Sequence, residues 1–306
     1  MKKNKKKSRL ILLGLTAAAT VATVALINKK RHKTTFKVRN VKITSKRLTN
    51  IYCTINVCDT DKMMPLVIFA HGFGADRHEG GRFSEVADNL AAMGIASIRM
   101  DFPGCNQSEE SFAAFAIRNM LDDIATCIEY MISNYQIDQQ HMGMIGYSMG
   151  GRLAVIYAAA NPKFKTLALW APALTHNMEG LEDFMGGVDK LNEMIKVAEK
   201  KGYVRFKDIF DNDKIISKEY YEDMAKYDPL AALNTYKDNL LIVQGNKDDI
   251  VTPTIINKAL RYVNKECNFN YLYMDHANHG FGLWDEHPEQ SAKLVKTTTK
   301  FFERYL

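Results

Sequence analysis

The sequence predicts an α/β fold, in which helices cover both faces of a mostly parallel sheet. Several short runs are apolar without a break, as in strands buried on both faces, and helical segments separate them. Strands and helices that alternate in this way build a parallel sheet. The expected order includes strands at 66–70, 96–99, 142–145, 166–169, 240–243 and 270–274, and helices at 83–93, 112–134, 151–160 and 288–305.

The start of the folded region has a different pattern. Between Phe36 and Val57, apolar residues at 51, 53, 55 and 57 alternate with polar neighbours. Strict alternation is typical of half-buried strands. We therefore expect antiparallel strands at this edge of the sheet.

The alternation of strand and helix lapses between residues 171 and 238. Loops of this length without structure are uncommon in compact domains, so we expect an inserted helical or α+β lid there. The insertion is rich in aromatic residues, which either line a substrate pocket or form the insertion's own core. They are Tyr203, Phe206, Phe210, Tyr220 and Tyr221.

Gly146-Tyr147-Ser148-Met149-Gly150 reads G-x-S-x-G between a predicted strand and a predicted helix. This pattern is typical of a sharp turn that lifts a serine hydroxyl above the edge of a sheet, with glycines where larger residues would clash. Ser148 is therefore the candidate nucleophile. The alternative is a serine in an ordinary tight turn.

The strand at 66–70 opens into His71-Gly72-Phe73-Gly74. This is the expected position of an oxyanion loop, where backbone N–H groups stabilise the negative oxygen that forms when an acyl carbonyl is attacked. We expect the backbone N–H groups of Phe73 and Met149 to form the oxyanion hole. The alternative is a plain glycine-rich turn.

An acid follows the predicted strand at 240–243. Asp248 fits the pattern G-x-x-D-x-x-V that runs from Gly245 to Val251, whereas Asp249 is expected to point elsewhere or to cap the next helix. Asp248 is therefore the candidate for the residue that orients a catalytic base.

Two histidines, His276 and His279, follow the strand at 270–274 and compete for the role of base. His279 is preferred because Gly-Phe follows it, and His276 is then a loop residue. An H-x-x-H pair can also indicate metal, but the sequence offers no convincing third ligand group. We expect no metal and no cofactor.

The three candidates occur in the order serine, acid, histidine, as the nucleophile-elbow arrangement requires. A serine hydroxyl is a poor nucleophile until a positioned base removes its proton. His279 would take the proton of Ser148, and Asp248 would orient the imidazole and stabilise its charged form.

With these motifs, residues 36–306 resemble the α/β-hydrolase superfamily. Within it, the chain is similar to bacterial cinnamoyl or feruloyl esterases and to serine-aminopeptidase-like hydrolases. The segments that carry this resemblance are His71–Gly74, Gly94–Gly104, Gly146–Gly151 and Tyr227–Leu230. One departure is Cys105-Asn106-Gln107-Ser108, where many relatives have a second glycine before the serine.

The resemblance implies a serine hydrolase that cleaves carboxylic esters through an acyl-enzyme, with short-chain or aryl esters as substrates. The same three residues would also serve a monoacylglycerol lipase, a thioesterase or a small-peptide amidase. A noncatalytic binding protein that kept the fold is a further alternative, because a fold does not choose a function.

Residues 1–33 form a separate region, which precedes the hydrolase domain at 34–306. An uncharged apolar stretch, Leu10–Ile27, follows six basic residues and precedes four more. Its length favours a single-pass membrane anchor over a removed signal peptide. The excess of basic residues before it predicts an extracytoplasmic catalytic domain on the cell membrane. The alternative is secretion after cleavage near residues 21–25.

Net charge supports the same division of the chain. The whole chain carries a formal charge of +6, but residues 1–33 hold ten Lys or Arg and no acid. The remaining 31 basic and 35 acidic residues make the hydrolase domain mildly acidic. The composition therefore indicates contact with anionic lipid and gives no case for nucleic-acid binding.

Five cysteines, an odd number, favour free thiols over a disulfide framework.

Overall fold

The computed structural model describes residues 34–208, 211–285 and 287–306. The predicted membrane anchor at 1–33 lies outside these residues. Within the described ranges, no helix is both long and apolar enough to cross a membrane.

An eight-stranded sheet forms the centre of the domain, in the order β1-β2-β4-β3-β5-β6-β9-β10. β2 runs antiparallel to β1 and to β4, and the remaining neighbours are parallel. The predicted α/β class with a mostly parallel sheet is therefore confirmed. The strands are β1 (Phe36–Thr44), β2 (Asn50–Cys58), β3 (Met64–Ala70), β4 (Ala96–Met100), β5 (Ile137–Tyr147), β6 (Phe164–Trp170), β9 (Asn239–Gly245) and β10 (Asn268–Met274).

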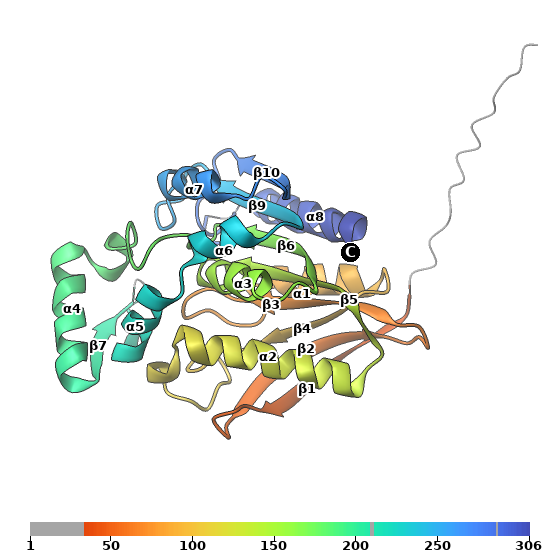
Figure 1. The fold of residues 1–306 in the computed structure, drawn as a ribbon, viewed down its shortest axis with the longest axis horizontal. Helices are drawn as coiled ribbons and strands as arrows, with labels where there is room; N and C mark the ends of the chain where they lie inside the picture. The colour runs from red at the N-terminus through yellow and green to blue at the C-terminus, as the bar shows by residue number, and fades with distance from the viewer. Residues whose placement is uncertain (1–33, 209–210, 286) are drawn as a thin grey trace, which may run out of the picture. The chain divides into compact units, whose positions relative to one another are not determined.

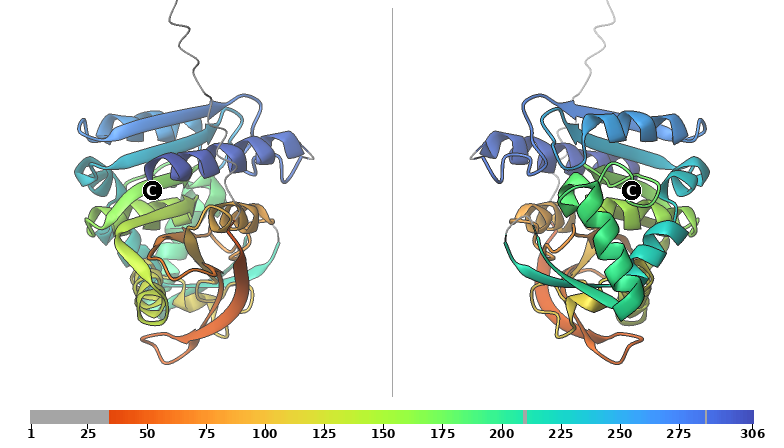
Figure 2. Two further views of the ribbon diagram at one scale, coloured as in Figure 1. Left: turned by 90° about the vertical axis from the view of Figure 1, so that its right-hand side faces the viewer. Right: turned by 90° about the vertical axis from the view of Figure 1, so that its left-hand side faces the viewer.

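Helices cover both faces of this sheet (Figures 1 and 2). α1 (Arg82–Ala91) and α8 (Pro288–Tyr305) pack on one face, and α2 (Ile117–Asn134) and α3 (Met149–Ala159) on the other. Successive side chains of a strand point to opposite faces. Accordingly, Phe69 of β3 belongs to the core beside α1 and α8, whereas Ile68 belongs to the core beside α2 and α3.

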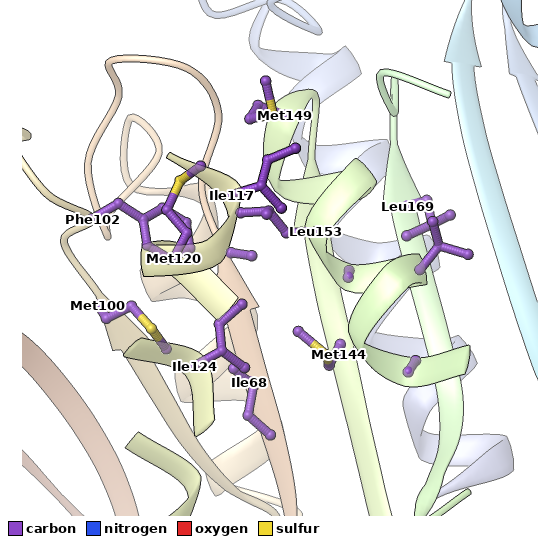
Figure 3. Packing of buried hydrophobic residues seen from close by; sticks show 14 of the residues in the cluster. Ile68, Met100, Phe102, Ile117, Met120, Ile124, Met144, Met149, Leu153 and Leu169 are labelled. Atoms are coloured by element: carbon purple, nitrogen blue, oxygen red, sulfur yellow. The ribbon is translucent and has the colours of Figure 1, made fainter. Parts of the chain in front are cut away.

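The core beneath α2 and α3 is built from interlocking aliphatic, methionine and phenylalanine side chains (Figure 3). Full burial of each such side chain stabilises the fold by about 1.5–3 kcal/mol relative to exposure. This core supports the strand ends from which the candidate site projects. Its labelled members are Ile68, Met100, Phe102, Ile117, Met120, Ile124, Met144, Met149, Leu153 and Leu169.

The helix predicted over 112–134 is interrupted. A short 3₁₀ turn, η1 (Phe112–Ala114), precedes α2, which begins only at Ile117. Ser111 accepts a hydrogen bond from the Ala113 N–H, 3.2 Å away, and Ala116 is extended with φ −125°. The cap at Ser111 begins only the short turn, and the extended backbone of Ala116 separates this turn from α2, so the prediction of a continuous helix is wrong here.

The segment between β6 and β9 contains both helices and strands. Its elements are η2 (Asp183–Met185), α4 (Val188–Lys201), the antiparallel pair β7 (Tyr203–Lys207) and β8 (Asp213–Ser217), α5 (Lys218–Lys226) and α6 (Pro229–Thr235). α4, β7 and α5 lie to one side of the sheet (Figure 1). After β9, the chain forms α7 (Pro253–Ala259) and η3 (Leu260–Tyr262) before β10.

Arg152 of α3 fastens this inserted segment to the core. Its side chain is fully buried, and its two terminal nitrogens donate only to backbone carbonyls. Burial lowers the pKa of Arg152 to about 10. The hydrogen bonds from Nη1 and Nη2 offset part of the cost of burying the charge, although Nε has no partner. Through them, Arg152 ties α3, the helix that follows Ser148, to the insertion. The acceptors are the carbonyls of Ala173, Thr175, Asn177, Met224 and Tyr227.

Candidate active site

The candidate residues follow four parallel strands at their carboxyl ends. The loop after β3 holds Phe73, and Ser148 follows β5, which is the neighbour of β3. Asp248 and His279 follow β9 and β10, which are also neighbours. Parallel strands end at one edge of a sheet, and ligands bind in the crevice outside this edge.

Ser148 lies on a strained turn between β5 and α3. Its backbone has φ 53° and ψ −117°, a conformation that few residues other than glycine adopt. The Ser148 N–H donates to the carbonyl of Trp170, 2.9 Å away. A Cβ at Gly150 would overlap the carbonyl of Ala70, so only glycine lets α3 approach β3 this closely.

Asp248 and His279 form a buried pair. The Nδ1 of His279 lies 2.8 Å from Oδ2 of Asp248, and the two residues are 4% and 3% exposed. The other acceptor positions of the carboxylate are also used, which holds it in one orientation. Its further donors are the N–H groups of Ile250 (3.0 Å) and Val251 (2.9 Å) and the side-chain amide of Gln244 (3.2 Å).

The competing residues of both loops point elsewhere. Asp249 and His276 are exposed, and the His276 N–H donates to Oδ1 of Asn246 at 2.7 Å. The structure thus brings His279, and not His276, to Asp248. Among the described residues, no group of three or more His, Cys, Asp or Glu side chains could hold a metal ion.

His71 fixes the peptide that precedes Phe73. The Phe102 N–H donates to Nε2 of His71 at 3.0 Å, so Nε2 carries no proton and Nδ1 is the donor to the Gly72 carbonyl at 2.8 Å. Burial lowers the pKa of His71, which keeps the imidazole neutral. The Gly72 carbonyl and the Phe73 N–H belong to one planar peptide, so this bond also sets the direction of the N–H.

The residues that carry the two amides expected in the oxyanion hole lie near Ser148. A Cβ on Gly72 would lie 3.5 Å from Cβ of Ser148, so the loop of Phe73 lies against the serine. Met149 is the first residue of α3, where N–H groups have no partner within the helix. Such an N–H is available to an anion.

Ser148 and His279 line one cavity of about 230 Å³. Its apolar walls are Phe73, Phe184, Ile250, Leu283 and Trp284, and its polar lining includes Asp76, Glu79, Arg82, Asp208 and Asn212. Phe184, Asp208 and Asn212 come from the inserted segment, which therefore contributes to the cavity wall.

The aromatic residues of the insertion have a different place. Tyr203, Phe206, Tyr220 and Tyr221 are not among the described residues that line the cavity, and Phe210 lies outside the described residues. Tyr220 is 2% exposed and packs edge-on against Phe73 with ring centroids 6.0 Å apart. Tyr220 therefore belongs to the core and does not line the substrate cavity.

The segment Cys105–Ser108, where the sequence departs from the pattern of many relatives, is part of a polar loop beside the site. Arg77 pairs with the buried Asp101 and donates to Oε1 of Gln107 at 2.6 Å. Asn106 adopts φ 45° and donates to Oδ2 of Asp101 at 3.0 Å. These hydrogen bonds stabilise the loop. None of the four residues at 105–108 lines the cavity.

The chain is similar to known proteins. A family model described as serine aminopeptidase, S33, matches residues 61–231, which is more than half of the chain. The chain belongs to this family of α/β hydrolases.

The hydrolase is also similar to individual proteins. A monoglyceride lipase homolog from Monkeypox virus is 22% identical over 223 residues, which are 70% of this chain and 76% of the relative. The structure of Est1E from Butyrivibrio proteoclasticus with ferulic acid bound has a TM-score of 0.66 at 17% identity, covering 86% of this hydrolase and 99% of Est1E. An esterase domain from Rhodothermus marinus has a TM-score of 0.64 at 16% identity, covering 88% and 99%.

Glu79 and Arg82 are residues of the site that the sequence did not indicate. Both are almost fully buried and line the cavity of the hydrolase. Burial raises the pKa of Glu79 from 4.5 to about 7, and Asp76 adds to the rise, while the Gly72 N–H and Arg82 oppose it. The only signal in the sequence is a charged residue within a glycine-rich turn, which does not distinguish an inward side chain from a solvated one.

The raised pKa of Glu79 predicts that the stability of the hydrolase depends on pH. The raised pKa in the folded state means that wild type loses stability relative to Glu79→Gln as pH rises from about 4.5 to about 7. The total change is about 3 kcal/mol, because each pKa step of one corresponds to about 1.4 kcal/mol. Urea unfolding of both proteins between about pH 4 and pH 8 measures it.

Glu85→Gln, on the exposed side of α1, controls for the loss of one negative charge. A constant difference between wild type and Glu79→Gln across this pH range would contradict the prediction.

Proposed function

We propose that this hydrolase cleaves carboxylic esters through an acyl-enzyme formed on Ser148. The main support is the buried pair of Asp248 and His279, 2.8 Å apart, of which His279 lines the same cavity as Ser148. A nucleophile, a base and a group that orients the base are the minimum set for this chemistry.

The tautomer of His279 follows from its partner. Nδ1 donates to Asp248, so Nε2 is the nitrogen that takes the proton as Oγ of Ser148 bonds to the acyl carbon. The imidazolium then gives this proton to the departing alcohol. A water molecule, activated by the same nitrogen, releases the acid and restores the serine.

The negative oxygen of the tetrahedral intermediate would be held by the N–H groups of Phe73 and Met149. The hydrogen bond between His71 and the Gly72 carbonyl supports this role for Phe73, because it fixes the peptide before substrate binds. Donors that are oriented in advance stabilise the transition state without a cost of reorganisation.

The cavity favours a small acyl group, short-chain or aryl. A volume of about 230 Å³ with walls formed by Phe73, Phe184 and Trp284 suits an aromatic or short aliphatic chain. The ferulic acid bound to the structurally similar Est1E supports the aryl class. The similarity to a monoglyceride lipase homolog makes monoacylglycerol the second candidate.

Hydrolysis by the full chain of p-nitrophenyl acyl esters, methyl ferulate and a monoacylglycerol tests the proposal. We expect Ser148→Ala to reduce turnover by about 10³-fold or more while the protein stays folded, because the hydroxyl supplies the covalent step. Full activity of Ser148→Ala would reject the mechanism. The preferred ester in wild type distinguishes an aryl esterase from a lipase.

The adjacent acids provide a matched pair of variants. Asp248→Asn should lower kcat by about 10³–10⁴-fold, because it imposes the wrong tautomer on the imidazole. Asp249→Asn makes the same chemical change on an exposed residue and should lower kcat by no more than about twofold. The reverse ranking in an esterase assay would contradict the role of Asp248.

We further propose that residues 1–33 anchor the hydrolase to the cell membrane with the catalytic domain extracytoplasmic. The basic start and the uncharged stretch at 10–27 support this proposal. We expect the protein to be found at its full-length mass in the membrane fraction and to be released from it by detergent but not by high salt. Protease added to intact cells should digest the catalytic domain. A shortened chain in the medium would instead indicate a cleaved signal peptide, and protection from protease would place the domain inside.

A further inference from the structure

A buried ion pair, Glu79 and Arg82, lies between the two loops on which the proposed chemistry depends. The residues are 5% and 4% exposed, and both line the cavity. Oε2 of Glu79 and Nη2 of Arg82 are 3.7 Å apart. Since desolvation of two charges often outweighs their attraction, such a pair is weak evidence for stability, and another role is to be sought.

Glu79 holds the loop after β3. Its Oε1 accepts a hydrogen bond of 2.7 Å from the Gly72 N–H. His71 holds the Gly72 carbonyl on the following peptide. Both peptide groups of Gly72 are thereby fixed, and the N–H of the next residue, Phe73, has one direction.

Arg82 holds the loop after β10. Its Nη1 donates to the Gly280 carbonyl at 2.6 Å, and its guanidinium lies over the ring of Tyr147, 5.3 Å from the centroid. The Tyr147 hydroxyl donates to the His279 carbonyl at 2.8 Å, and the two rings stack with centroids 5.1 Å apart. The carbonyls of His279 and of the next residue are thus both fixed.

The turn that carries this pair is strained. Glu79, Gly80 and Gly81 have φ values of 47°, 61° and 91°, in the left-handed region that costs free energy for a glutamate. A Cβ on Gly80 would lie 2.5 Å from Cδ2 of Leu283, so the loop of His279 packs directly on this turn. In this conformation the side chains of Glu79 and Arg82 are both buried and line the cavity.

We propose that Glu79 and Arg82 are positioning residues. They keep the oxyanion loop after β3, which holds Phe73, at a fixed separation from the loop after β10, which holds His279. Glu79 acts through the Gly72 N–H, and Arg82 acts through the Gly280 carbonyl. Neither residue exchanges a proton with the substrate. The proposal rests on the proposed function, and it adds a link between two loops that are about 200 positions apart in the chain.

Four variants of the full chain test this link: Glu79→Ala, Glu79→Gln, Arg82→Met and Arg82→Lys. Asp123→Asn is the matched control, because Asp123 is also buried and paired with an arginine, Arg47, but does not line the cavity. For each protein, kcat and KM are measured on the ester that wild type prefers, together with Tm and the rate of labelling by a fluorophosphonate.

We expect Glu79→Ala and Arg82→Met to lower kcat by about 30-fold or more, since the loss of one oxyanion donor costs about 10²–10³-fold. KM should stay within about threefold, because the change affects the transition state more than substrate binding. Glu79→Gln keeps a hydrogen-bond acceptor and Arg82→Lys keeps a cation at the same place. Each should recover at least about a third of the lost kcat on a logarithmic scale. Asp123→Asn should lower Tm without this loss of kcat.

Three results would overturn the proposal. One is a kcat of Glu79→Ala equal to that of wild type. Another is a loss that tracks Tm across all variants, Asp123→Asn included. The third is a rise in KM at constant kcat, which would make the pair a substrate-binding group. If Glu79→Ala does not fold, Glu79→Gln and Arg82→Lys still separate kcat from KM. A wild type that neither hydrolyses esters nor reacts with the probe would instead reject the proposed function itself.

Discussion

Close approach of backbone to backbone around Ser148 is the constraint on which the site depends. Gly150 lies against the carbonyls of Ala70 and His71, and Gly151 lies against Pro172. Any side chain at Gly150 would push α3 away from β3 and so separate the serine from the loop of Phe73. The strained backbone of Ser148 persists because the strands on either side of β5 hold it in place.

The order of the strands then determines which residues meet. β3 and β5 are neighbours, so the loop of Phe73 lies beside Ser148, and β9 and β10 are neighbours, so Asp248 meets His279. Helices on both faces bury the central strands, and the candidate residues follow the carboxyl ends of four of the strands. The inserted segment adds cavity wall above this edge and is tied back to α3 by Arg152.

Two buried arginines near the site make different sets of contacts. Arg152 donates to carbonyls alone and connects α3 to the insertion, whereas Arg82 combines two carbonyls, a carboxylate and an aromatic face. Each joins segments that are distant in the chain. In a site built from loops of separate strands, such long polar side chains are suited to fix the loops relative to one another, because they reach across them with directed hydrogen bonds.

Local signatures in the sequence predicted the α/β class, strands of the central sheet, the helices α1, α2, α3 and α8, and the candidates at 148, 248 and 279. These signatures are unbroken apolar runs, glycines at a tight turn and polar residues after a strand. The interruption before α2 lies at the extended residue Ala116, which the apolar pattern of the segment does not reveal. The inward orientation of Glu79 and Arg82 and the place of Tyr220 in the core are seen only in the folded molecule. Burial depends on what packs against a residue from distant parts of the chain, and no local pattern records it.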